Sequence, residues 1–201
     1  MFVQVVQGRV TDAGQVRAAY DRWFDEVSPG AAGWLGTTAG VSGDGDFIAL
    51  MRFESAMAAR DNSRRPEHAT WWERTAKLFA GEVHAAESIT AYEDRGGACD
   101  RAGFVQVIQR RVRDVARARQ ILKELSPLVT ACRPEDIGTL IVEHDGGRFT
   151  VAVYFTSERE ARGTERRPAP DLQALRDEQN ALGLEPPRFH DLREPWFYAP
   201  R

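Results

Sequence analysis

The strongest constraint on the fold of this 201-residue chain is an internal repeat. The segment FVQVVQGRVTD at residues 2–12 returns as FVQVIQRRVRD at residues 104–114. With a constant offset of 102 and no gaps, 23 of the 82 residue pairs that start at positions 2–83 are identical. Identity spread over the whole segment indicates that the second half of the chain duplicates the first. Both halves must therefore form the same elements in the same order.

The pattern of each half predicts the element order β-α-β-β-α-β. Each half opens on a Val-rich strand, and the aspartate that follows it is a typical helix N-cap. Apolar residues at helical spacing come next, followed by two strands joined by a tight turn that contains glycine. A second helix is expected over about residues 66–79 and 168–182, with Pro66 and Pro168 in the first turn. A fourth strand, HAAESITAY or RFHDLREPWF, completes each half.

This element order is that of a ferredoxin-like unit, whose helices cover one face of its sheet. The other face is partly apolar and must be covered, and two copies in one chain can cover each other. The predicted fold is therefore α+β, with a first ferredoxin-like repeat at residues 1–92, a linker at 93–103 and a second repeat at 104–201. The second repeat includes an aromatic C-terminal segment, which we expect to cover a sheet edge or to mediate self-association.

In its element order and duplication, the chain resembles the dimeric α+β barrel superfamily in a tandem, pseudo-dimeric form. That superfamily includes the antibiotic-biosynthesis-type monooxygenases, or ABM-like proteins. The resemblance covers both halves, and it rests on architecture rather than on a diagnostic motif, so it supports the fold more than an activity. It implies a pseudo-dimeric barrel in which the helix-free faces of the two sheets enclose a cavity, the default place for a ligand.

Composition and charge exclude several classes of protein. The chain is 42% hydrophobic and 28% charged with a formal net charge of -3, which is ordinary for a globular protein and unlike a nucleic-acid binder. No apolar run approaches the roughly 20 residues that a membrane helix needs, and no signal peptide pattern is present. The two cysteines form no CxxC pair. We expect a cytoplasmic protein, either a monomer (an internal pseudo-dimer) or a homodimer, that binds neither nucleic acid nor membrane.

The repeated first strand offers one set of candidate ligand-binding residues. Neighbouring strand residues point to opposite faces, and each first strand carries two glutamines of opposite parity, so only one pair can face the cavity. The candidates that we take share one parity: Gln7, Gln109, Arg9 and Arg111. The alternative is that the repeated glutamines satisfy local backbone groups or line the seam between the halves.

The second helix offers another set, because the halves differ most there. The first half reads RRPEHATWWERTAKLF where the second reads RRPAPDLQALRDEQNAL. His68 is the candidate catalytic acid or base, since the unperturbed pKa of histidine is near 6.5. Trp71 and Trp72 are candidates for an apolar wall against a flat ligand. The alternative is one core tryptophan, one surface tryptophan and a solvated histidine.

No motif in the sequence predicts a cofactor or a metal. The chain contains no GxGxxG, GxxxxGK[ST] or GxSxG, and its four histidines form no HxxxH or HxH pair. Heme-degrading members of the resembled superfamily carry a histidine about three turns after the helix tryptophan. Here Glu82 and Val83 stand near that position, so heme degradation is not expected.

Three hypotheses of function follow. The first is a cofactor-independent, ABM-like monooxygenase, in which the substrate supplies the electrons and the protein supplies a dry pocket and one base. The second is a non-catalytic protein that binds a small apolar or aromatic molecule. The third is an interaction scaffold whose barrel is filled by its own large side chains, such as Phe47, Phe53, Phe149, Tyr154 and Phe155.

Overall fold

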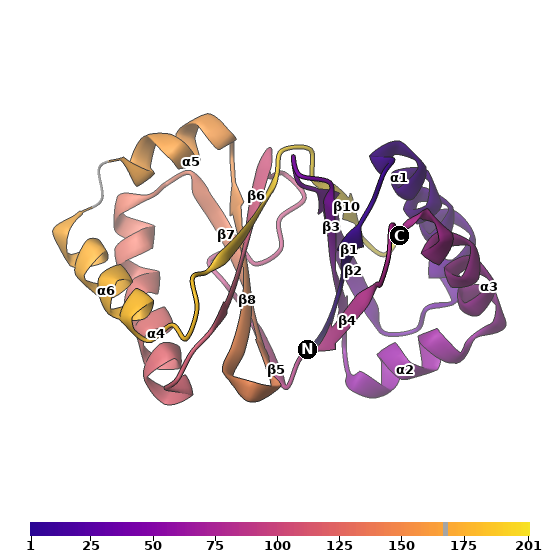
Figure 1. Cartoon of the computed structure of the whole chain (residues 1–201), viewed down its shortest axis with the longest axis horizontal. Helices are drawn as coiled ribbons and strands as arrows, with labels where there is room; N and C mark the ends of the chain where they lie inside the picture. The colour runs from indigo at the N-terminus through magenta and orange to yellow at the C-terminus, as the bar shows by residue number, and fades with distance from the viewer. Residues whose placement is uncertain (167–168) are drawn as a thin grey trace. The chain divides into compact units, whose positions relative to one another are not determined.

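The computed structural model describes residues 1–166 and 169–201 and divides the chain into two compact units. The first consists of Met1–Thr90 with Glu194–Arg201, and the second of Ala91–Arg193. Each unit contains one five-stranded sheet, and all helices of a unit lie on one face of its sheet (Figure 1). The predicted α+β class is therefore confirmed, with the ferredoxin-like order of elements in each repeat.

The first unit has the strand order β10-β2-β3-β1-β4. Its strands are β1 (Phe2–Arg9), β2 (Trp34–Val41), β3 (Asp46–Phe53), β4 (His84–Glu87) and β10 (Trp196–Tyr198). Its helices are α1 (Ala13–Arg22), α2 (Ala56–Arg64) and α3 (Pro66–Thr75). A short π-helical segment, Trp23–Val27, continues α1.

The second unit has the matching strand order β5-β7-β8-β6-β9. Its strands are β5 (Thr90–Asp94), β6 (Phe104–Arg111), β7 (Asp136–His144), β8 (Arg148–Phe155) and β9 (Arg188–Leu192). Its helices are α4 (Val115–Cys132), α5 (Glu158–Glu165) and α6 (Pro170–Ala181).

The duplication is visible in the register of the strands. Phe2 pairs with Phe53 across β1 and β3, and at the same offset Phe104 pairs with Phe155 across β6 and β8. A register shift interrupts β2 at Trp34 and β7 at the matching residue Asp136. The predicted N-caps are also present, because the side chains of Asp12 and Asp114 accept hydrogen bonds from backbone N–H groups three residues on. The offset of 102 residues thus holds in three dimensions.

The helices that follow the third strands differ from the prediction. In the first unit, α2 was not predicted, and Ser55 caps it where the chain leaves β3. Pro66 then stands in the first turn of α3, as expected. In the second unit, Pro168 lies outside the described residues, and α6 begins at Pro170.

The C-terminal aromatic segment covers a sheet edge, which confirms one of its two predicted roles. Strand β10 pairs with β2 in the first unit, where Trp196 lies opposite Ala39 and Tyr198 opposite Thr37. Both aromatic side chains are buried, and the Tyr198 hydroxyl donates to Asp21 Oδ1 at 2.7 Å. The pairing satisfies backbone groups of β2 that an uncovered edge would leave open.

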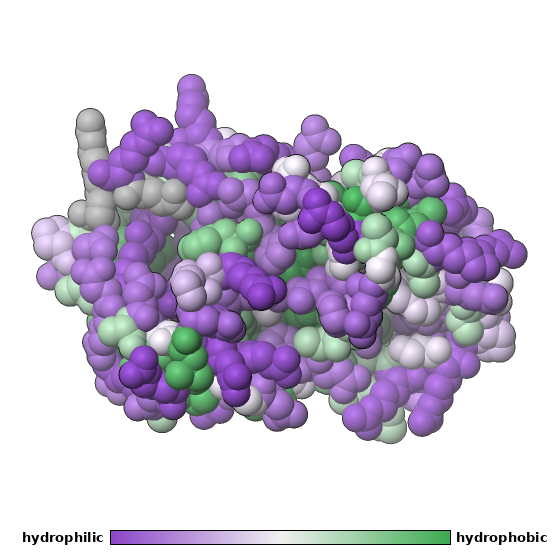
Figure 2. All heavy atoms as spheres, in the orientation of Figure 1, coloured by the Kyte–Doolittle hydropathy of each residue, from purple (hydrophilic) through white to green (hydrophobic). Residues whose placement is uncertain are grey.

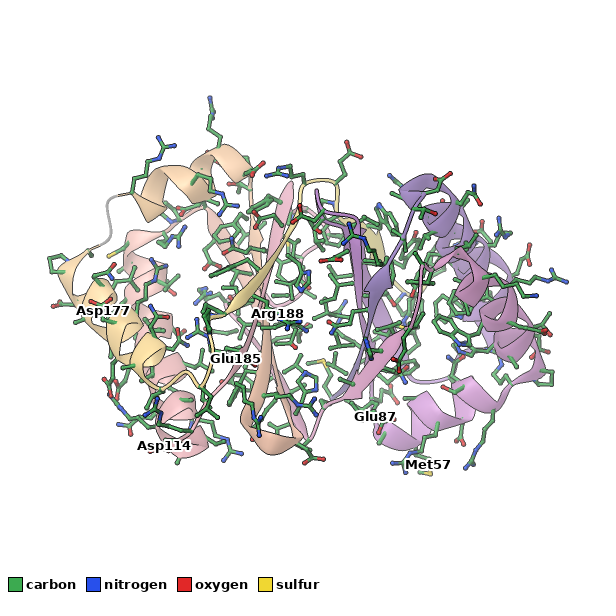
Figure 3. All side chains as sticks on the ribbon, viewed as in Figure 1. Met57, Glu87, Asp114, Asp177, Glu185 and Arg188 are labelled. Carbon is green, nitrogen blue, oxygen red and sulfur yellow. The ribbon has the colours of Figure 1, made fainter. Side chains whose placement is uncertain are left out.

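In each unit a hydrophobic core lies between the sheet and the helices (Figure 3). Phe47 and Phe53 pack there with Tyr20 and Trp23 of the first unit. Phe149 and Phe155 do the same in the second, against residues of α4 and α5. The expectation that these four phenylalanines fill the helix-free side is therefore wrong. Strand alternation places Tyr154 on the opposite face from Phe155.

The surface is consistent with the composition. The face shown in Figure 2 carries mostly hydrophilic residues, and hydrophobic ones gather in small areas. Among residues 1–166 and 169–201, no helix is both long enough and apolar enough to cross a membrane.

Candidate functional site

The second unit contains a pocket between its sheet and helices α4 and α6, with a volume of about 330 Å³. The pocket extends across the sheet, because residues from all five strands line it, from Asp94 on β5 to Phe189 on β9. Most of the wall is aliphatic. The aliphatic lining residues are Ile108, Leu122, Leu125, Val129, Ile141, Val151 and Val153.

The wall of this pocket is aliphatic where the matching positions of the first repeat are aromatic. In the first unit, Tyr20 and Trp23 are each 1% exposed, and Trp23 packs edge-on against Trp34 at 4.9 Å between ring centroids. At an offset of 102 these three positions become leucine, leucine and aspartate, at Leu122, Leu125 and Asp136. Each replacement removes a ring, so the pocket of the second unit reaches space beside α4 that aromatic side chains fill in the first unit.

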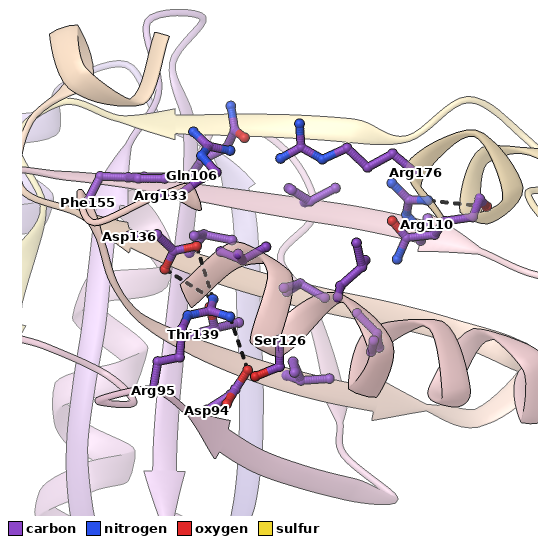
Figure 4. Close-up of a pocket in the computed structure, with 18 of the residues that line it drawn as sticks. Asp94, Arg95, Gln106, Arg110, Ser126, Arg133, Asp136, Thr139, Phe155 and Arg176 are labelled. Carbon is purple, nitrogen blue, oxygen red and sulfur yellow. Dashed lines mark hydrogen bonds and ion pairs between the residues drawn. The ribbon is translucent and has the colours of Figure 1, made fainter. Parts of the chain in front are cut away.

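One side of the pocket carries a charged cluster built around Arg95 (Figure 4). Its guanidinium donates to the two carboxylate oxygens of Asp136 at 3.1 and 3.0 Å, to Asp94 at 3.1 Å and to the Thr139 hydroxyl. Arg95 follows β5 and has a positive φ of 58°, a rare conformation for a residue with a side chain. Burial raises the pKa of Asp136 to about 6, although Arg95 opposes the rise.

Other arginines complete the polar part of the wall. Arg133 is buried, pairs with Glu135 at 2.9 Å and stacks on the ring of Phe155 at 5.3 Å. In Figure 4, Arg110 and Arg176 lie on the opposite side of the view from the Arg95 cluster. The pocket thus combines an aliphatic wall with a few converging charged groups, which is the usual chemistry of a small-molecule site.

The first unit contains a pocket at the matching place, with a volume of about 580 Å³. It reaches only the strands β4, β1 and β3, because the aromatic core occupies the remaining space. The predicted residues His68, Trp71 and Trp72 line this pocket together. Trp71 is buried with its indole N–H bonded to the backbone oxygen of Ala19 at 2.7 Å, so it is also a core residue.

The hydrogen bonds of His68 define its protonation state. Its Nδ1 accepts from the indole N–H of Trp23 at 3.2 Å and lies 3.3 Å from the amide nitrogen of Asn62. Since an indole N–H can only donate, Nδ1 carries no proton and Nε2 carries it. Burial, with a contribution from Arg65, lowers the pKa of His68 to about 4. The ring is therefore neutral at pH 7, and its role as an acid or base remains a prediction.

The other predicted residues lie elsewhere. Strand alternation places Gln7 and Gln109 on the face of their sheets opposite the helices, while Gln4 and Gln106 line the two pockets. The side-chain amide of Gln109 contacts the side chains of Thr150 on β8 and His190 on β9, each at 3.3 Å.

The two predicted first-strand arginines lie outside both pockets. Arg9 pairs loosely with Asp46 at 3.8 Å between two exposed side chains, and Arg111 donates to the backbone oxygen of Gly146 at 3.2 Å. The structure therefore brings together the three residues of the second helix, and it does not bring the first-strand set to them.

The residues that line the second-unit pocket were missed, although the alignment of the halves contains a signal for them. The aromatic residues of the first helix are lost in the second copy, and Gly8 becomes Arg110 on a strand that is otherwise nearly unchanged. A loss of large core residues combined with a gain of charge on the same sheet face indicates a cavity that has acquired polar groups.

Metal binding has no structural support in the described part of the chain. Among residues 1–166 and 169–201, no group of three or more His, Cys, Asp or Glu side chains could hold a metal ion.

The chain matches no protein-family model and no curated protein sequence. Solved structures match it over nearly its whole length. A candidate monooxygenase from Fusobacterium nucleatum superposes with a TM-score of 0.79 at 10% identity, covering 98% of this chain and 94% of that one. A candidate monooxygenase from Lactobacillus acidophilus gives 0.75 at 12%, covering 98% and 95%.

An anthrone oxidase-like protein gives a TM-score of 0.68 at 10% identity, covering 98% of this chain and 93% of that one. These neighbours confirm the predicted resemblance at the level of the fold. Function has to be argued from the site, because identities this low transfer the fold alone.

Proposed function

We propose that the second-unit pocket binds a small, largely apolar aromatic molecule, and that the protein oxidises this molecule with dioxygen without a bound cofactor. The observation that carries the proposal is the pocket, with its aliphatic wall and the Arg95–Asp136 cluster beside it. Its volume of about 330 Å³ lies at the small end of the roughly 300–1,000 Å³ typical of ligand pockets, which suits a compact fused-ring molecule. The structural neighbours described as candidate monooxygenases or as anthrone oxidase-like support an oxygenase activity.

Asp136 is the candidate base for this chemistry. Its carboxylate lines the pocket, Arg95 fixes its position, and a pKa raised to about 6 by burial suits proton abstraction near neutral pH. In an anthrone, the CH₂ group lies across the central ring from the ketone, and its loss of a proton gives an electron-rich enolate that is conjugated through the aromatic rings. The enolate reduces dioxygen, and the CH₂ becomes C=O. One oxygen atom stays in the product, the other leaves as water with the two hydrogens, and the substrate supplies all the electrons.

Binding is tested by isothermal titration with 2-naphthamide, a neutral fused-ring probe. Leu125→Trp restores the residue of the first repeat and should fill the pocket, so binding is lost while the near-UV circular dichroism retains a folded pattern. Gln120→Trp is the matched control, because it adds the same ring at an exposed position of the same helix. Equal affinity in wild type and Leu125→Trp would place the binding site elsewhere.

Turnover is tested by oxygen consumption with 1,8-dihydroxyanthrone in the dark. Asp136→Asn should lower the rate by about 10²-fold or more, the usual contribution of a general base. Asp177→Asn is the control, because it makes the same change at an exposed position of α6. An unchanged rate in Asp136→Asn removes this residue from the mechanism.

Non-catalytic binding is the second candidate, and one observation favours it. Asp136 is already held by Arg95 through both carboxylate oxygens, so the pair can simply orient a bound molecule. Binding of the naphthalene probe without any oxygen consumption by the wild type would decide for this function. The same assays on His68→Gln test the predicted role of His68, which requires a loss of turnover at unchanged affinity.

A further inference from the structure

Arg110 is a cation on a sheet face whose neighbouring positions are mostly apolar. Strand β6 directs Gln106, Ile108 and Arg110 toward the helices, and all three line the pocket. The matching residue in the first repeat is Gly8, where even a Cβ atom would come within 2.8 Å of the ring of Phe79. The long cation therefore occurs in the copy that has no aromatic ring at this place.

The burial of Arg110 is poorly compensated within the chain. Its hydrogen bond among the described residues is to the backbone oxygen of Gln179, at a long 3.4 Å. Burial lowers the pKa of Arg110, and no carboxylate in the described part of the chain offsets that effect. Arg110 is half-buried, and a guanidinium partly withdrawn from water is commonly matched by an anion, so the site has a place for one.

The acidic side chains near this end of the pocket are engaged by other partners. Glu178 of α6 forms two hydrogen bonds of 2.6 Å with Arg117, and Asp177 accepts from Gln173 at 2.7 Å. Asp136 is held by Arg95 on the other side of the pocket. The described pocket wall contains four arginines and two aspartates, and Arg133 is paired with Glu135 outside the wall.

We propose that the ligand of this pocket is an aromatic carboxylate, whose anionic group binds Arg110 while its rings lie against the aliphatic wall. The guanidinium offers a planar fork of donors that matches the two oxygens of a carboxylate, and Arg176 adds a second positive charge to the same wall. The inference rests on the proposed ligand-binding function and names its ligand class.

The experiment compares 2-naphthoate with 2-naphthamide, which have nearly the same size and differ in charge. Isothermal titration of the wild type at pH 7.5 should show the carboxylate binding about 10- to 100-fold more tightly, the range expected for a charge-assisted hydrogen bond. Arg110→Met should abolish this preference and leave the affinity for the amide intact. Arg110→Lys keeps the charge without the fork, and it should keep only part of the preference.

Arg111→Met is the paired variant, because it removes the same charge from the next residue, whose side chain lies outside the pocket. It should retain the full preference for naphthoate. Equal affinity of the wild type for both probes would overturn the inference and leave the proposed binding function intact. A preference that survives in Arg110→Met, or in full in Arg110→Lys, would also overturn it. Absence of binding by both probes would refute the binding function itself, and this inference with it.

Discussion

His68 should make the first unit sensitive to acid. Burial and Arg65 hold the pKa of the folded His68 at about 4, whereas an unfolded histidine titrates near 6.5. Between pH 6.5 and 4, His68 binds a proton in the unfolded chain and remains unprotonated in the folded chain. The contribution of His68 to the free energy of unfolding is therefore fully present above about pH 6.5 and is lost as the pH falls toward 4. With allowance for the exposed part of the ring, the loss is about 1–2 kcal/mol by pH 5.

Urea unfolding followed by tryptophan fluorescence reports on the first unit, which contains His68, because all five tryptophans belong to that unit. His68→Gln is the informative variant, since an amide oxygen can still accept from the indole of Trp23 but does not titrate in this range. The free energy of unfolding of the wild type should fall between pH 7.5 and 5 by about 1–2 kcal/mol more than that of His68→Gln.

The comparison with His68→Gln also cancels the contribution of Asp136, whose sign is opposite. Its pKa is raised to about 6, so it stabilises the folded state at acid pH and this stabilisation is lost as the pH rises through 6. Parallel pH profiles for wild type and His68→Gln would refute the reasoning about His68.

Two further predictions concern the aromatic core of the first unit. Trp23→Leu removes a side chain that is 1% exposed and should cost about 2–4 kcal/mol in urea unfolding, and a cost below about 1 kcal/mol would contradict its place in the core. Trp72→Leu, at a half-buried position, should cost clearly less. Deletion of residues 194–201 removes Trp196 and Tyr198 and uncovers β2, so the first unit should lose about 3 kcal/mol or more and the chain should self-associate. An unchanged urea midpoint and sedimentation coefficient would count against the structural role of β10.

The fold was predictable because the duplication provides two independent sequences for each predicted helix and strand. The Val-rich opening strands, their aspartate caps and the turn before the third strand recur at one offset, and all of them appear in the structure at that offset. Each predicted fourth strand is broken in two in the structure, the first into β4 and β5 and the second into β9 and β10, and these breaks were not predictable. Local sequence does not encode that β10 pairs with β2, because this pairing joins residues more than 150 positions apart.

The candidate site was only partly predictable. Helical spacing brought His68 and Trp71 onto one pocket wall, as expected from residues three positions apart. Strand parity showed that one pair of glutamines had to face the helices, but it could not say which pair. That choice depends on the packing of Phe2 and Val6 against the helices, which is a property of the whole unit. Arg95 could not be predicted as a pocket residue, because it follows β5 in a segment that was predicted to be a linker.

The contrast between the two units suggests a division of roles within the duplicated chain. Charged side chains line the 330 Å³ pocket beside the aliphatic ones, so water can occupy it in the absence of a ligand. A flat apolar ligand would replace water against Leu122 and Leu125 and occupy the space that Tyr20 and Trp23 fill in the first unit. On the proposed binding function, a ligand would supply in the second unit the packing that aromatic side chains supply in the first.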